Sequence, residues 1–184
     1  MEIWYTLTGD IDKKTVQDSI SWINGELYSK AVTRMKFMIA SGGGDIGAAV
    51  NLYTYMKALP IEVETIGFGE VDAAATLIFL AGHSRIAVED CHFFFHEGRY
   101  TIADQTAPVH THEEAISVFK RELHNMIYII ARETNNDTEV VAMMLRKSKI
   151  MSSEEAKEFG LVHQLVAKLP LKQQEEKGIG FGPH

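Results

Sequence analysis

The chain has 184 residues, of which 46% are hydrophobic and 23% are charged, which excludes a disordered acidic tail and a collagen-like chain. Its length predicts about one domain, since a typical domain has roughly 150 residues. Eighteen Lys and Arg against 25 Asp and Glu give a formal net charge of -7 with no local basic stripe, so we expect no nucleic-acid partner.

Cys91 is the single cysteine, which excludes an internal disulfide framework and a cysteine-based zinc cage. It agrees with a reducing compartment, and cytoplasm is the expected location. No window approaches ~18 uninterrupted apolar residues, and the first residues do not resemble a secretory signal. We therefore expect a protein that is neither secreted nor membrane-spanning.

The first half of the chain alternates short apolar runs, which predict strands, with segments of three- and four-residue apolar spacing, which predict helices. The predicted order is a strand over 3–8, a helix over 15–28, a strand over 35–40 that ends in Ser41-Gly42-Gly43-Gly44, a helix capped by Asp45 and ended by Pro60, and a strand over 61–68. Such alternation implies β-α-β units and a mostly parallel sheet. The predicted fold class is α/β.

The second half begins with a tight connection over 69–72 and a segment, 73–81, that is apolar all round and predicts a buried helix. The remaining predictions are strands over 85–88 and 92–96, a loop over 98–111, a long helix over 113–134, capping boxes at Asn136/Glu139 and Ser152/Glu155, and a strand over 161–166. Residues 1–168 are expected to form a single domain and 169–184 a flexible tail.

Two turns that open helices after strands, Ser41 to Gly44 and Gly69 to Ala74, are candidate sites. Unpaired N–H groups and the positive end of a helix dipole gather there and stabilise a developing oxyanion. The alternative interpretation of a triple glycine is a strained turn without a functional role. No Gly-Lys-Ser or Gly-Lys-Thr follows it, which excludes a Walker loop, and the spacing to Gly47 does not fit a dinucleotide fingerprint.

His92 and His96 lie on one face of a predicted strand, with Phe93 and Phe95 on the other. They are roughly 13 Å apart, too far to share one metal. His96 stands where the strand enters a loop, a usual place for a catalytic imidazole, and a structural role is the alternative. Four further residues at the start of the long helix could bind a metal ion, but a solvated first helical turn is the expected interpretation. They are His110, His112, Glu113 and Glu114. No metal and no cofactor are predicted.

Several short motifs follow one another in a characteristic order. They are Leu7-Thr8-Gly9, Ile39-Ala40-Ser41-Gly42-Gly43-Gly44, Gly69 leading to Ala73, Ile78-Phe79-Leu80-Ala81-Gly82, Phe94-Phe95-His96, Met151-Ser152-Ser153-Glu154-Glu155-Ala156 and Phe159-Gly160-Leu161-Val162. The ordered set resembles the proteolytic subunit of the Clp protease, in the wider group that includes crotonases and signal peptide peptidases. The resemblance implies a ClpP/crotonase-like fold of repeated β-α-β units with a mostly parallel sheet and a protruding long helix.

In that family a serine attacks the peptide carbonyl, a histidine takes its proton and an aspartate orients the histidine. The resemblance puts the serine position on Ala73, the histidine on His96 and the aspartate position on Ser148. The oxyanion hole falls on the backbone N–H groups of Gly44 and Ala74, which do not depend on the serine. Other carboxylates that could orient the histidine are Asp72, Glu97 and Asp104.

Ala73 has no hydroxyl, so the resemblance implies an inactive chain. Loss of the nucleophile costs serine proteases about a million-fold in turnover. The retained His96 favours a serine that was replaced, whereas Ser148 favours a naturally silent subunit, and both origins stay open. A non-catalytic ring or scaffold subunit is one alternative function, and a crotonase-like acyl-CoA enzyme is the other.

The resemblance also implies partners: a peptide or unfolded protein substrate, a homo-oligomer of stacked rings joined by the helix over 113–134, and an AAA+ ATPase. Gly42 in place of the family's proline, and a start almost at the first strand, put docking to a known ATPase in doubt. A helix packed wholly within its own subunit is the alternative to stacked rings.

Overall fold

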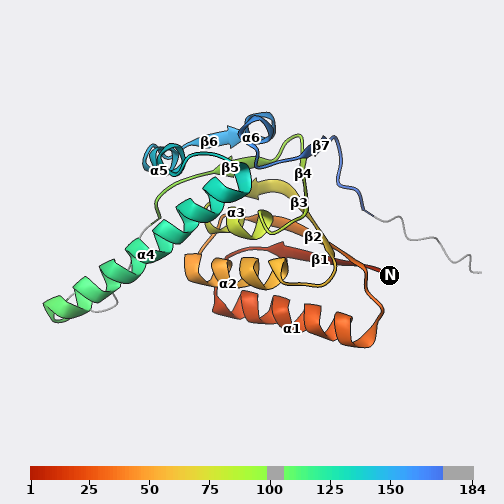
Figure 1. The fold of residues 1–184 in the computed structure, drawn as a ribbon, viewed down its shortest axis with the longest axis horizontal. Coiled ribbons are helices and arrows are strands. Elements are labelled where there is room, and N and C mark those ends of the chain that lie inside the picture. The colour runs from red at the N-terminus through yellow and green to blue at the C-terminus, as the bar shows by residue number, and fades with distance from the viewer. Residues whose placement is uncertain (99–105, 172–184) are drawn as a thin grey trace, which may run out of the picture.

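A parallel sheet forms the centre of the structure, a computed structural model that describes residues 1–98 and 106–171 (Figure 1). Its strands pair in parallel in the order β1-β2-β3-β4-β7, with bounds Glu2–Thr8, Arg34–Ser41, Glu62–Val71, Ser84–Val88 and Gln164–Val166. β5 (His92–Phe94) pairs in parallel with the end of β3, and β6 (Ile150–Ser152) pairs antiparallel with β5. The predicted α/β class with a mostly parallel sheet is correct.

The helices of the described residues cover one side of this sheet and extend beyond it (Figure 1). Their bounds are Lys13–Ser29 for α1, Ile46–Lys57 for α2, Ala74–Phe79 for α3, Val109–Thr134 for α4, Thr138–Arg146 for α5 and Ser153–Phe159 for α6. Asp12 and Asp45 start α1 and α2, because their carboxylates accept the N–H groups of Thr15 and Ala48. The predicted cap at Asp45 is therefore confirmed.

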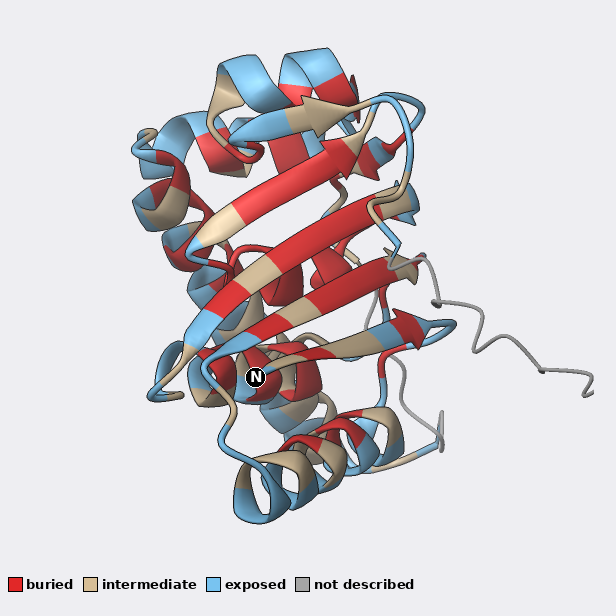
Figure 2. Ribbon diagram, turned by 90° about the vertical axis from the view of Figure 1, so that its right-hand side faces the viewer, coloured by how far each residue is buried: buried red, intermediate tan, exposed pale blue. Residues whose placement is uncertain are grey.

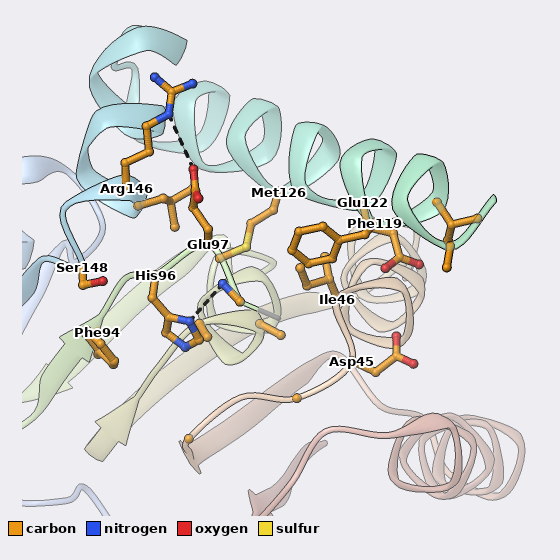
Figure 3. Close-up of a pocket in the computed structure, with 18 residues that line it drawn as sticks. Asp45, Ile46, Phe94, His96, Glu97, Phe119, Glu122, Met126, Arg146 and Ser148 are labelled. Carbon is orange, nitrogen blue, oxygen red and sulfur yellow. Dashed lines mark hydrogen bonds and ion pairs between the residues drawn. The ribbon is translucent and has the colours of Figure 1, made fainter. Parts of the chain in front are cut away.

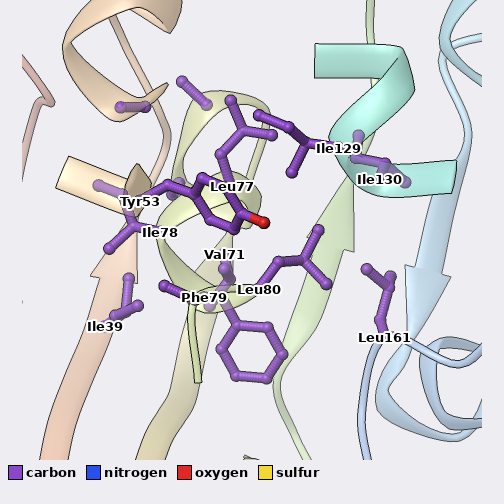
Figure 4. Close-up of a cluster of buried hydrophobic side chains, with 14 of the residues drawn as sticks. Ile39, Tyr53, Val71, Leu77, Ile78, Phe79, Leu80, Ile129, Ile130 and Leu161 are labelled. Carbon is purple, nitrogen blue, oxygen red and sulfur yellow. The ribbon is translucent and has the colours of Figure 1, made fainter. Parts of the chain in front are cut away.

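The short helix α3 lies at the centre of the core, and all six of its residues are buried, as its all-round apolar sequence predicts. Leu77 and Ile78 lie among Ile39 of β2, Tyr53 of α2 and Ile130 of α4 (Figure 4). Full burial of a side chain of this size contributes about 1.5–3 kcal/mol. Figure 2 shows that the central stretches of the middle strands are buried, and α3 packs against β2 and β3 there.

β3 continues to Val71, so the predicted connection over 69–72 is wrong for its first three residues. After a register shift Val71 pairs with Ser41, and Glu70 pairs with His92. Gly69 has a φ of 62°, a conformation that glycine adopts without strain. Pairing with residues distant in the sequence, Ser41 and His92, thus extends β3 through a polar segment whose sequence resembles a turn.

α4 begins at Val109, so the loop predicted over 98–111 is wrong from 109 onward. The predicted strands over 92–96 and 161–166 are shorter in the structure, where they end at Phe94 and begin at Gln164. Residues 99–105 and 172–184, which include Asp104 and most of the predicted tail, lie outside the described residues. No helix within 1–98 or 106–171 is long and apolar enough to cross a membrane.

One predicted capping box forms and the other does not. Ser152 and Glu155 make both reciprocal bonds at the start of α6. At α5 the cap is Asp137, which accepts the N–H of Glu139, while the amide of Asn136 donates to carbonyls of Thr134 and Phe159. The prediction misses by one residue because both neighbours are good capping residues.

Candidate active site

The glycine turn after β2 is pinned to the loop before α1. Ile11 donates its N–H to the Gly43 carbonyl at 2.9 Å and accepts the Asp45 N–H at 2.8 Å. The Ser41 hydroxyl donates to the Gly9 carbonyl at 2.6 Å and accepts the Gly43 N–H at 3.1 Å. These bonds hold Gly44 in a fixed orientation.

Ala73, at the start of α3, has a φ of 46° and a ψ of -120°, a rare conformation for a residue other than glycine. Such a backbone costs of order 1–3 kcal/mol and persists only where its surroundings enforce it. The Ala73 N–H donates to the Phe94 carbonyl at 2.8 Å, and the Asp72 carboxylate accepts the Phe94 N–H at 2.7 Å. The backbone N–H and carbonyl of Phe94, at the end of β5, therefore both hold the strained turn in place.

A cavity of about 1080 Å³ brings the predicted site residues together (Figure 3). Its wall includes all five of them: Gly44, Ala73, Ala74, His96 and Ser148. Among the described residues, neither the Gly44 N–H nor the Ala74 N–H donates a hydrogen bond. Two free amide donors, an imidazole and a strained strand-to-helix turn thus share one cavity, an arrangement that can hold and polarise a carbonyl group.

The imidazole of His96 packs on the ring of Phe94, with centroids 4.9 Å apart, and its Nδ1 accepts the Gly98 N–H at 3.0 Å. Since Nδ1 accepts, the neutral ring carries its proton on Nε2. The neighbours Phe93 and Phe95 are fully buried, as the predicted strand face requires. The ring that faces the cavity is therefore held by main chain and aromatic contacts.

No carboxylate of the described residues forms a hydrogen bond or ion pair with His96. Asp72 points its other oxygen toward His92, at 3.9 Å, and Glu97 pairs with Arg146 at 3.5 Å. Burial raises the pKa of Asp72, and the N–H of Phe94 partly offsets this. Ser148, with a φ of 52°, is exposed at the cavity wall. Asp72 and Glu97 are thus already engaged elsewhere.

One group of the described residues has the geometry to hold a metal ion. Glu70, Asp72 and His92 bring one donor atom each within 4.8 Å of the others. This group differs from the cluster of His110, His112, Glu113 and Glu114 considered in the sequence, and its Asp72 carboxylate already accepts the Phe94 N–H.

Sequence reasoning misses the part of the cavity wall that α4 and the start of α2 provide. Phe119, Glu122 and Met126 line it from α4, and Asp45 and Ile46 line it from α2. The apolar stripe of α4 contains Phe119 and Met126, but a stripe alone does not distinguish a cavity wall from the core. Glu122 carries no local signal at all.

Comparison with known proteins identifies the family of the chain. The family model described as Clp protease matches residues 5–168. The chain is 28% identical over 167 residues to the ATP-dependent Clp protease proteolytic subunit 2 of Treponema pallidum (strain Nichols), which covers 88% of this chain and 81% of that protein. A mutant of ClpP1 from Listeria monocytogenes has the same fold, with a TM-score of 0.78 and 20% identity over 90% of this chain and 91% of the other. The chain belongs to the Clp protease family.

Proposed function

We propose that this chain is a Clp protease subunit that binds peptide in the cavity but, with Ala73 at the nucleophile position, does not cleave it. The observation that carries the proposal is the shared wall of Ala73, His96 and the two free N–H groups of Gly44 and Ala74. A peptide carbonyl that accepts from both amides lies over the methyl group of Ala73. No hydroxyl is present there to form an acyl-enzyme.

The hydrogen bond of His96 supports the same proposal. A general base needs a free lone pair on Nε2, which the family's aspartate secures by accepting the proton of Nδ1. Here the Gly98 N–H occupies the lone pair of Nδ1 and leaves the proton on Nε2. Ser148 has no carboxylate with which to reverse this preference. The chain thus departs from the catalytic pattern at the nucleophile and at the base.

Labelling with a serine-directed fluorophosphonate tests this proposal. We expect no labelling of the unmodified chain, slow labelling of Ala73→Ser, and labelling faster by about 10²–10⁴ when Ser148→Asp is added. Adding His96→Ala to the double variant should abolish the gain. Far-UV circular dichroism controls for folding. Absence of labelling in the folded double variant would contradict the proposal and favour a scaffold subunit.

We propose further that the chain assembles into stacked rings through α4 and works with an AAA+ ATPase in the cytoplasm. The buried residues of α4 all lie from Met126 onward, whereas its first half projects from the body of the subunit (Figure 1). Val109 and Val118 in that half are 73% and 44% exposed. Apolar side chains on a projecting helix favour burial against a second copy.

A further inference from the structure

Two carboxylates gather where α4 crosses the start of α2, in the wall of the cavity. A Cβ on Gly47 would lie 2.8 Å from Oε1 of Glu122 and 3.3 Å from Oδ1 of Asp45. The missing side chain of Gly47 therefore leaves the space that both oxygens share. Figure 3 shows Glu122 descending from α4 toward Asp45 at the α2 end of the cavity.

Within the described residues, no direct contact neutralises the charge of this pair. Oδ1 of Asp45 accepts the Ala48 N–H at 2.8 Å, which leaves the other oxygen. The Glu122 carboxylate forms no hydrogen bond or ion pair with any described residue. Burial, and then the charge of Asp45, raise the pKa of Glu122, and the charges of Arg121 and Lys13 lower it. The half-buried carboxylate of Glu122, beside that of Asp45, therefore favours binding of a cationic group of a ligand.

The rest of this part of the wall is apolar. Ile46, Phe119 and Met126 flank the two carboxylates. Lysine and arginine combine an aliphatic stem that packs on such surfaces with a cationic head that carboxylates bind. A small inorganic cation would use only the carboxylates and would leave the apolar wall without a role.

Chain connectivity links this wall to the amide turn. Gly44, which lines the cavity and whose N–H donates no hydrogen bond within the described residues, directly precedes Asp45. A peptide whose carbonyl binds that N–H therefore has a neighbouring side chain within reach of Asp45 and, across the cavity, of Glu122. The position of the pair matches a side-chain subsite of an extended peptide.

We propose that Asp45 and Glu122 form a subsite that selects peptides with a lysine or arginine side chain beside the carbonyl held at Gly44. This inference rests on the proposed function, since it requires peptide in the cavity. A charge-assisted hydrogen bond is stronger than a neutral one, and the apolar wall contributes equally to a basic side chain and to its uncharged analogue. The difference in affinity between a peptide with a basic side chain and one with its uncharged analogue therefore measures the contribution of the two carboxylates.

Fluorescence polarisation with three labelled peptides, identical except for one lysine, norleucine or glutamate, tests the subsite on the assembled protein. We expect the lysine peptide to bind about 10-fold more tightly than the norleucine peptide and the glutamate peptide to bind most weakly. Glu122→Gln should reduce the lysine preference to about twofold. Glu122→Lys should reverse the order of the lysine and glutamate peptides.

Glu113→Gln is the matched control, because Glu113 is exposed on the same helix and is not part of the cavity wall. It should leave the lysine preference unchanged. Equal binding of the lysine and norleucine peptides, with Ala73→Ser/Ser148→Asp still labelled, overturns the subsite alone. Absence of binding by all three peptides, together with absence of labelling, overturns the proposed function and the subsite with it.

Discussion

Gly44 has a φ of 146° and lies against the main chain of Ile11. A Cβ at this position would lie 2.2 Å from the Ile11 carbonyl oxygen, a backbone atom that the bonds of Gly43 and Asp45 hold in place. We expect Gly44→Ala to lower the free energy of unfolding by more than about 2 kcal/mol, because it adds a backbone clash to an unfavourable φ. Urea denaturation followed by circular dichroism measures the loss.

Gly42 provides the control for this substitution within the same turn. Its φ is not in the left-handed region, and the nearest atom to its Cβ would be Oε1 of Glu70, at 3.7 Å. Gly42→Ala should therefore change the free energy of unfolding by no more than about 0.5 kcal/mol. Equal losses for the two variants would show that the turn is not constrained by Ile11.

The candidate site was predictable from the sequence only where a local motif contains its residues. The glycine turn, Ala73 and His96 each lie within a short recognisable pattern, and all three reach the cavity wall. The Asp45–Glu122 pair has no such pattern, because α2 and α4 meet only in the folded chain. The Gly98 bond to His96 is equally invisible in the sequence, since it depends on the loop conformation.

At the scale of elements, Glu133 joins α4 to α2 and β4. Its carboxylate accepts from the Tyr53 hydroxyl at 2.5 Å and the Lys57 ammonium at 3.3 Å, and lies 4.0 Å from Arg85. Burial alone would raise the pKa of Glu133, but the Tyr53 hydroxyl and the Lys57 charge outweigh burial and hold that pKa below its usual 4.5. The folded protein thus binds a proton here less readily than the unfolded chain.

This difference in proton binding sets a pH dependence. Stability from the lowered pKa is fully present above about pH 4.5 and is lost as the pH falls through the folded-state pKa. We expect Glu133→Gln to cost about 2 kcal/mol at pH 7 and progressively less below pH 4.5. Urea denaturation at pH 7 and pH 4 measures this. Glu114→Gln, exposed on the same helix, should cost little at either pH.

Element prediction succeeds where local apolar spacing marks a segment and fails where the ends of elements lack such a pattern. Apolar spacing identifies α1, α2 and α4 from residue 113 onward, because positions that pack against the body of the subunit impose that spacing. The first turn of α4 projects from the body, so no core imposes a pattern on 109–112, and its start is missed. The end of β3 is missed for another reason: its pairing with β5 joins residues distant in the sequence.

At the scale of the whole molecule, the first half of α4 projects from the body of the subunit and exposes apolar side chains (Figure 1). Val109 is 73% exposed, so replacing it removes little packing from the subunit itself. An aspartate in the first helical turn also interacts favourably with the helix dipole. Val109→Asp should therefore leave the fold of an isolated subunit intact.

In rings that stack through α4, the same substitution has a different effect. A twofold contact buries the same residue of both copies, so Val109→Asp puts two charges into the interface and removes apolar contact from it twice. We expect at least a 10-fold rise in the ring–ring dissociation constant, measured by sedimentation velocity, with unchanged far-UV circular dichroism. Tyr28→Asp is the control, because Tyr28 is 96% exposed at the end of α1, and it should leave assembly unchanged. A native chain that sediments as a stable monomer at all concentrations contradicts the stacked-ring proposal, since the exposed face of α4 then has no partner.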